Sequence, residues 1–168
     1  MNRYLYLVRH AKSSWDNPDW RDEERPLNER GKKDAPKMAK RIKERKISPS
    51  LLLTSHAKRT VKTCKIFAEV LNCPRTLIQN VENLYHADSE TMLKVIQEKG
   101  GKAEHLFLFG HNPGLTSLAN KLTGEQIINV PTCGVVAITF KLKNWNLIRF
   151  GVGKLKFFDF PKRLIRKD

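Results

Sequence analysis

Short apolar runs alternate along this chain with segments whose apolar residues recur at helical spacing, and this alternation limits the possible folds more than any other feature. Three runs predict strands: Tyr4–Val8, Leu51–Thr54 and Leu106–Phe109. Four segments have apolar residues three and four apart and predict helices: Ala35, Met38, Ala39 and Ile42; Ala57, Val61, Cys64, Ala68 and Leu71; Met92, Leu93 and Ile96; Leu115, Leu118, Ala119 and Leu122. Because such alternation is typical of a mostly parallel sheet covered by helices on both faces, we expect a three-layer α/β/α sandwich.

The C-terminal part of the chain, one proline and the chain length complete the predicted organisation. Residues 134–140 and 146–150 predict two further strands around a turn at Lys143-Asn144. Pro36 falls inside the first helical pattern, so we expect that helix to start near Asp34 or to be kinked there. Since 168 residues without an internal repeat suit one domain, we expect a single domain over residues 1–168.

Several classes of protein do not fit this composition. The apolar runs are far shorter than the roughly 20 residues of a membrane-spanning helix. The N-terminal apolar run stops at Arg9, which is too early for a secretory signal peptide. The cysteines, Cys64, Cys73 and Cys133, are odd in number and form no C-x-x-C pair, so we expect reduced thiols. These features predict a cytoplasmic protein without a membrane partner.

The charge balance indicates what the protein attracts. Thirty-two Lys and Arg residues against seventeen Asp and Glu residues give a net charge of +15. Such a chain attracts phosphate-bearing partners: nucleic acid, acidic proteins or small phosphorylated ligands. Part of the excess lies in residues 28–46 and 153–168, where a solvated helix face and a solubilising tail are the simplest interpretation. No RNA-binding or zinc-finger signature accompanies it, so a nucleic-acid partner is not favoured.

Histidines and arginines follow all three predicted strands of the parallel sheet. Arg9 and His10 come after the first strand, His56 and Arg59 after the second, and His111 after the third. In a sheet of this kind the ligand sits beyond the carboxyl ends of the strands. We therefore expect these side chains to converge on one ligand.

The chemistry that fits is phosphoryl transfer to a histidine. A neutral imidazole nitrogen can attack phosphorus and divide a hydrolysis into two easier displacements. The planar arginine fork donates two hydrogen bonds to phosphate oxygens, and the helix after Pro113 is expected to offer free N–H groups as well. The five histidines form no H-x-x-H or H-E-x-x-H pair, so we expect neither a metal nor another cofactor.

Five segments together resemble a known family. They are Tyr4-Leu-Tyr-Leu-Val-Arg-His-Ala-Lys-Ser13, Arg25-Pro-Leu-Asn-Glu-Arg-Gly31, Ser55-His-Ala-Lys-Arg-Thr60, Leu84-Tyr-His-Ala87 and Gly110-His-Asn-Pro-Gly114. In this order they are similar to the motifs of the histidine phosphatase superfamily, and more narrowly to the SixA-type phosphohistidine phosphatases. The resemblance implies a phosphoglycerate mutase-like fold and covers about two-thirds of the chain, from residue 4 to residue 114.

The resemblance also implies roles for individual residues. His10 would be the nucleophile that becomes phosphorylated, with Arg9, Arg59 and His111 completing the phosphate pocket. Arg25 would bind the substrate from the loop before the first long helix.

The sequence departs from the family pattern in the second motif and leaves one role open. His56 stands where a proline commonly follows the serine of that motif. The general acid is unknown: Glu82, His86 and Asp88 lie in the right region, but ordinary loop and helix-start roles are favoured for them.

Three functions remain in order of preference. The first is a metal-independent phosphatase that acts through phospho-His10 on phosphohistidine in proteins. Only about 50 residues separate Arg59 from Gly110, where larger superfamily members insert segments that cover the site, and an open pocket suits a protein substrate. The second is a small-molecule phosphatase or mutase of the same superfamily, and the third is a basic nucleic-acid-binding protein.

Overall fold

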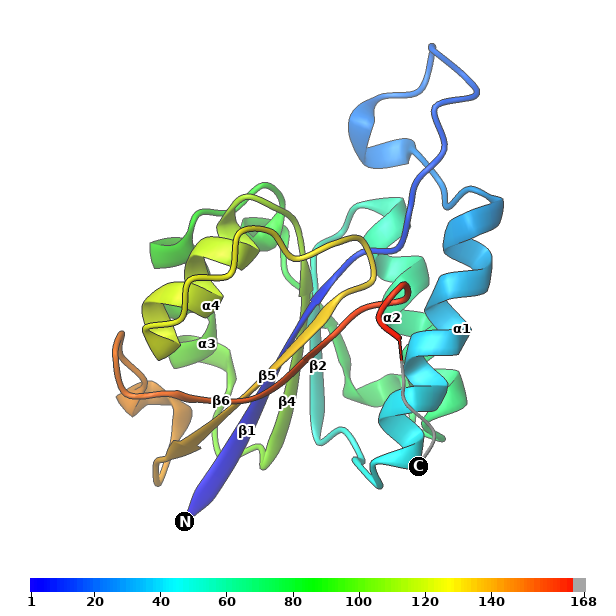
Figure 1. The fold of residues 1–168 in the computed structure, drawn as a ribbon. Coiled ribbons are helices and arrows are strands. Elements are labelled where there is room, and N and C mark those ends of the chain that lie inside the picture. Colours follow the sequence, from blue (N-terminus) through cyan, green and yellow to red (C-terminus); the bar gives the residue numbers. More distant parts are fainter. Residues whose placement is uncertain (165–168) are drawn as a thin grey trace.

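A single mixed sheet organises the chain (Figure 1). The computed structural model describes residues 1–164. The strands are β1 (Asn2–Arg9), β2 (Leu51–Thr54), β3 (Ile78–Asn80), β4 (His105–Gly110), β5 (Val135–Lys141) and β6 (Lys154–Asp159). Their order is β3-β2-β4-β1-β5-β6, with parallel pairing from β3 to β1 and antiparallel pairing of β5 with both β1 and β6. The predicted mostly parallel sheet is confirmed.

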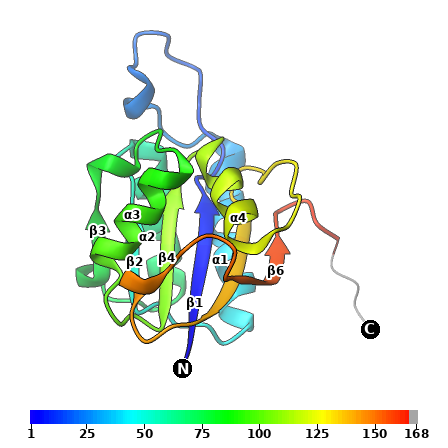
Figure 2. The ribbon, with the colours of Figure 1, turned by 90° about the vertical axis from the view of Figure 1, so that its left-hand side faces the viewer.

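Helices cover both faces of the sheet. They are α1 (Glu29–Glu44), α2 (Lys58–Val70), α3 (Ser89–Lys99) and α4 (Gly114–Thr123), with short 3₁₀ turns at η1 (Asp22–Glu24), η2 (Arg75–Leu77), η3 (Glu82–Leu84) and η4 (Trp145–Leu147). Figure 2 shows α3 and α4 on one face, and α1 and α2 on the other. The predicted three-layer sandwich is therefore correct. No helix within residues 1–164 has the length and apolarity needed to cross a membrane.

The two faces of β1 are both buried, which explains its nearly continuous apolar sequence. Leu5 and Leu7 pack with α3 and α4, whereas Tyr6 and Val8 pack with α1 and α2. Successive side chains of a strand point to opposite faces, so one short strand serves both halves of the core. The central position of β1 fixes where the residues after it emerge.

One predicted strand is wrong. Residues 146–150 do not form a strand, because Trp145 begins the η4 turn and β6 starts only at Lys154. The Trp145 side chain is fully buried, and its indole N–H donates to the carbonyl of Ala103 at 2.7 Å. Burial of this large ring packs the segment against α3 instead of pairing it with β5.

Other boundaries also differ from expectation. Helix α1 starts at Glu29 rather than near Asp34, since the Asn28 side chain caps it by accepting from the N–H of Gly31 at 2.9 Å. Pro36 lies within this helix. The short edge strand β3 was not predicted, because three residues carry too little periodicity to detect.

The contact between α1 and the loop after β1 generates a stability prediction. A Cβ atom at Gly31 would lie 2.2 Å from the backbone oxygen of Lys12, so a side chain there forces the helix and the loop apart. We expect Gly31→Ala to lower the free energy of unfolding by about 1–3 kcal/mol, measured by urea denaturation. Lys33→Ala, which changes an exposed neighbour, is the control and should change stability by less than about 0.5 kcal/mol. Equal stability of both variants would contradict this close packing.

Candidate active site

Parallel pairing of β1 with β4 brings two histidines together at the carboxyl edge of the sheet. Arg9 is in register with Gly110, and the N–H of His10 donates to the carbonyl of Gly110 at 3.2 Å. The next residues along both strands, His10 and His111, therefore face one another with ring centroids 5.3 Å apart. The predicted convergence of these two side chains is observed.

The His10 ring has one unprotonated nitrogen. Its Nδ1 lies 2.8 Å from the carbonyl oxygen of Ala11, which can only accept, so Nδ1 carries the ring proton and Nε2 carries the lone pair. Burial and the charges of Arg59, Arg9 and Arg25 together lower the pKa of His10 to about 4, against the opposing effect of the hydrogen bond to Ala11. His10 is thus neutral at pH 7, in the form that a nucleophile needs.

Arg59 contacts both histidines from the first turn of α2. Its Nε lies 3.4 Å from His10 Nε2, and its Nη2 lies 3.5 Å from His111 Nδ1. His111 Nε2 lies 2.8 Å from the hydroxyl of Ser55, and burial lowers the pKa of His111 to about 2. The guanidinium therefore supplies positive charge between two neutral rings.

Arg9 adds a second cation, which is half-buried. Its Nη1 donates to the carbonyl of Val130 at 3.0 Å, while its Nε is buried and has no hydrogen-bond partner among residues 1–164. A buried unpaired donor is costly, and a phosphate oxygen is the kind of acceptor that would satisfy it. Burial, followed by the charge of Arg59, lowers the pKa of Arg9.

The η1 turn contributes Asp22, a residue that the sequence did not single out. Asp22 Oδ2 lies 2.9 Å from Arg59 Nη2, 2.5 Å from the Tyr85 hydroxyl and 3.0 Å from His86 Nε2. Partial burial raises the pKa of Asp22, but the hydrogen bonds from Tyr85, Arg59 and His86 outweigh it and hold the pKa well below its usual range. Asp22 is thus an anion held against the cation of the site.

Arg25 holds the same loop. Its Nε donates to the carbonyl of Ser14 at 3.0 Å, its Nη2 donates to the Ser13 hydroxyl at 2.5 Å, and its Nη1 pairs with Asp22 Oδ1 at 3.0 Å. Its guanidinium carbon also lies 3.2 Å from the centre of the Trp15 ring. Arg25 is buried and near enough to influence His10, but these contacts anchor the loop, and its substrate-binding role remains a prediction.

The three candidates for the general acid occupy different places in the structure, and one of them reaches the site. His86 reaches the site, where its ring stacks on His111 with centroids 5.2 Å apart and its backbone has the unusual φ of 52°. Asp88 caps α3 by accepting from the N–H of Thr91, as expected for a helix start, and Glu82 is exposed at η3. His56 lies at the rim, 3.3 Å from Glu23. Tyr85 and His86 belong to the Leu84–Ala87 motif, and this motif is the feature of the sequence that could have predicted their place in the site.

The start of α4 differs from expectation. The N–H of Leu115 donates to the carbonyl of His111 at 3.0 Å, and the N–H of Thr116 donates to Asn112 Oδ1 at 3.2 Å. These two groups are therefore not free for an anion, because the turn that positions His111 already uses them.

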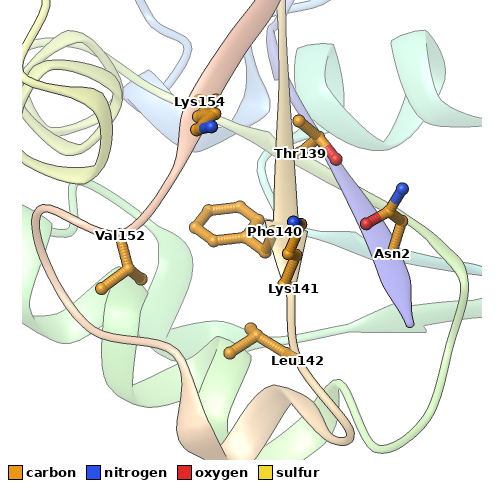
Figure 3. A pocket seen from close by; sticks show the side chains of 7 residues that line it. All are labelled: Asn2, Thr139, Phe140, Lys141, Leu142, Val152 and Lys154. Carbon is orange, nitrogen blue, oxygen red and sulfur yellow. The ribbon is translucent and has the colours of Figure 1, made fainter.

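A cavity at the opposite end of the sheet lacks these chemical groups. It has a volume of about 380 Å³ and is lined by residues from the start of β1, the end of β5 and the start of β6 (Figure 3). Within the described residues, its lining includes Lys141 and Lys154 but neither histidine nor arginine. The histidine and arginine cluster at the carboxyl edge is the better candidate for catalysis.

An α/β/α sandwich whose strand ends hold a neutral buried histidine beside arginines is typical of enzymes that transfer phosphoryl groups through histidine. Residues 5–130 match the model of the histidine phosphatase superfamily, branch 1. Because this match covers more than half of the chain, the protein belongs to that superfamily and is a phosphatase by family.

Individual similar proteins agree with this placement. A structure from Agrobacterium tumefaciens, assigned as the phosphohistidine phosphatase SixA, is 28% identical with a TM-score of 0.79 over 95% of this chain and 99% of that chain. A SixA-assigned structure from Nakamurella has a TM-score of 0.85 at 17% identity, over 97% and 98% of the two chains, which shows the shared fold. An uncharacterised chloroplastic protein of Arabidopsis thaliana is 30% identical over 161 residues, or 86% of this chain and 70% of the relative.

The environment of His10 generates a titration prediction. In the free protein, NMR titration of the ring nitrogens should give a midpoint near pH 4 instead of the ordinary 6.5, because burial and three arginines disfavour the imidazolium. At pH 7 the spectrum should show the tautomer protonated at Nδ1. His10→Asn identifies the signal by removing it. A midpoint near pH 6.5 would contradict the buried, neutral ring described above.

Proposed function

We propose that this protein is a metal-independent phosphatase that acts through a phosphohistidine intermediate on His10. The observation that carries the proposal is the geometry of this ring: Nδ1 donates to the Ala11 carbonyl, and the unprotonated Nε2 faces Arg59, whose Nε donates a long hydrogen bond of 3.4 Å to its lone pair. We assign Arg9, Arg59 and His111 to the phosphate pocket: Arg59 contacts His10 and His111, and the buried Nε of Arg9 offers a further donor for a phosphate oxygen.

The reaction has two displacements. First, the lone pair of His10 Nε2 forms a bond to phosphorus, and the bond from phosphorus to the leaving group breaks with its electron pair on the leaving group. Water then attacks the phosphoryl group, so that phosphate leaves and Nε2 regains its lone pair. The arginine charges stabilise the phosphoryl oxygens in both steps. The Asp22 anion, held with a low pKa, is poorly suited to donate a proton to the leaving group.

We infer that the preferred substrate is phosphohistidine in proteins. The nitrogen that leaves from phosphohistidine can itself be protonated, so a site without an evident general acid suits a phosphoramidate better than an alkyl phosphate. The SixA assignments of similar structures support the same substrate class. A small-molecule phosphatase or mutase of the superfamily is the alternative, while a nucleic-acid-binding role is not favoured.

The cellular compartment stays a prediction. The sequence predicts a cytoplasmic protein, whereas the relative from Arabidopsis thaliana is chloroplastic. We propose the cytoplasmic location on the sequence features alone.

The covalent step has a direct test. Incubation with a radiolabelled phosphohistidine protein and a rapid quench in base should trap one phosphate on His10, because a phosphoramidate is stable in base and labile in acid. Mild acid should release the label, and EDTA should not prevent its formation. His10→Ala should lose both label and turnover while its circular dichroism spectrum is unchanged. Substantial turnover by His10→Ala, or a requirement for a divalent metal, would refute the mechanism.

A comparison of substrates tests the proposed specificity. We expect kcat/KM for a phosphohistidine protein to exceed that for a phosphoserine peptide and for sugar phosphates by at least about tenfold, or about 1.4 kcal/mol of transition-state stabilisation. The physical reason is the easier protonation of the leaving nitrogen. A preference for sugar phosphates would instead favour the small-molecule alternative.

A further inference from the structure

A basic cleft lies beside the proposed phosphate pocket and takes no part in the mechanism above. It has a volume of about 620 Å³ and lies between α2 and the segment that leads into α1, which are neighbours on one face of the sheet (Figure 1). Four lysines line it, and we call it the lysine cleft: Lys32, Lys58, Lys62 and Lys65. Its remaining lining includes the apolar residues Pro26, Leu27 and Val61.

The charges of this cleft are largely uncompensated. Lys58, Lys62 and Lys65 follow one another at helical spacing along α2, and none of the three lies within 4 Å of a carboxylate in the part of the chain described. Lys32 pairs at 3.3 Å with the highly exposed Glu29. Among residues 1–164, no acidic residue lines the cleft. Like charges at this spacing repel one another, so an anionic occupant would relieve the repulsion.

The cleft and the proposed phosphate pocket both border on the start of α2. Lys58 directly precedes Arg59 at the start of α2. The acidic turn η1 lies across the junction, with Asp22 paired to Arg59 and the next residue, Glu23, 3.3 Å from His56 in the cleft lining. The junction between pocket and cleft thus already binds two consecutive carboxylates of the chain itself.

We propose that the lysine cleft binds an acidic segment of the protein substrate, next to its phosphorylated residue. This proposal rests on the proposed phosphatase function and deepens it. From Lys58 to Lys65 the helix rises by about 10 Å, which matches about three residues of extended chain. The occupant is therefore a short stretch with two or three Asp or Glu residues, whose aliphatic atoms pack on the apolar lining.

The surface suits an acidic peptide better than a nucleic acid. Proteins that bind single strands combine charge with aromatic side chains on which bases stack. The lining of the cleft has no Phe, Tyr or Trp residue. The cleft is also short, whereas a nucleic acid backbone carries its charge along an extended track.

The test compares two phosphohistidine peptides of equal length, one with aspartates beside the phosphohistidine and one with serines in their place. The wild-type protein should show a higher kcat/KM for the acidic peptide, and added salt should reduce this advantage. The double variant Lys62→Glu/Lys65→Glu should lose about tenfold in kcat/KM on the acidic peptide, since each lost contact is of the exposed ion-pair kind and repulsion adds to the loss. Its hydrolysis of p-nitrophenyl phosphate should be unchanged.

The matched control is Lys94→Glu/Lys99→Glu, which makes the same charge change at exposed positions of α3 on the other face of the sheet. It should retain the preference for the acidic peptide. Equal losses in both double variants would show a general effect of net charge and overturn the proposal, as would equal kcat/KM for the two peptides. Loss of oligonucleotide binding without a change in peptide preference would assign the cleft to nucleic acid instead.

A separate measurement distinguishes failure of this proposal from failure of the proposed function. Fluorescence anisotropy of the labelled acidic peptide without phosphate reports on the cleft alone. If the wild-type protein hydrolyses neither phosphopeptide but binds the acidic peptide, and Lys62→Glu/Lys65→Glu does not, the cleft assignment holds and the phosphohistidine assignment fails. Equal binding by the wild-type protein and this variant overturns the cleft assignment.

Discussion

The parallel pairing of β1 with β4 is the constraint on which the site depends. Its register matches Arg9 with Gly110, so the two strands end together and His10 meets His111. Burial of both faces of β1 holds that register, because a shift by one residue would exchange its two sets of core side chains. The same packing that forms the core thereby places the nucleophile candidate.

Electrostatic balance in the site follows from that placement. Arg9 and Arg59 bring two positive charges to a buried region, while desolvation keeps His10 and His111 neutral. Asp22 contributes one negative charge beside Arg59, and Tyr85 and His86 also contact its carboxylate. The site thus combines a neutral nucleophile with an excess of positive charge, which is the combination that transfer of a phosphoryl group requires.

The sequence predicted much of the fold and part of the site. Four strands of the sheet, β1, β2, β4 and β5, and its four helices follow from apolar patterns in the sequence, and the topology rule places the ligand beyond the strand ends. His10, Arg59 and His111 follow from their positions directly after those strands. The strand expected at 146–150 failed because burial of Trp145, a tertiary contact, outweighed a local alternation of apolar residues.

The sequence by itself determined which chemistry-bearing residues stand at the ends of the strands, because that depends on order along the chain and on local periodicity. Only the tertiary structure decided the partners of Asp22, which lie 37, 63 and 64 positions away at Arg59, Tyr85 and His86. It likewise decided that lysines of α1 and α2 line one cleft. The physical reason is that contacts between loops and helices distant in sequence depend on how the layers pack, which no local pattern records.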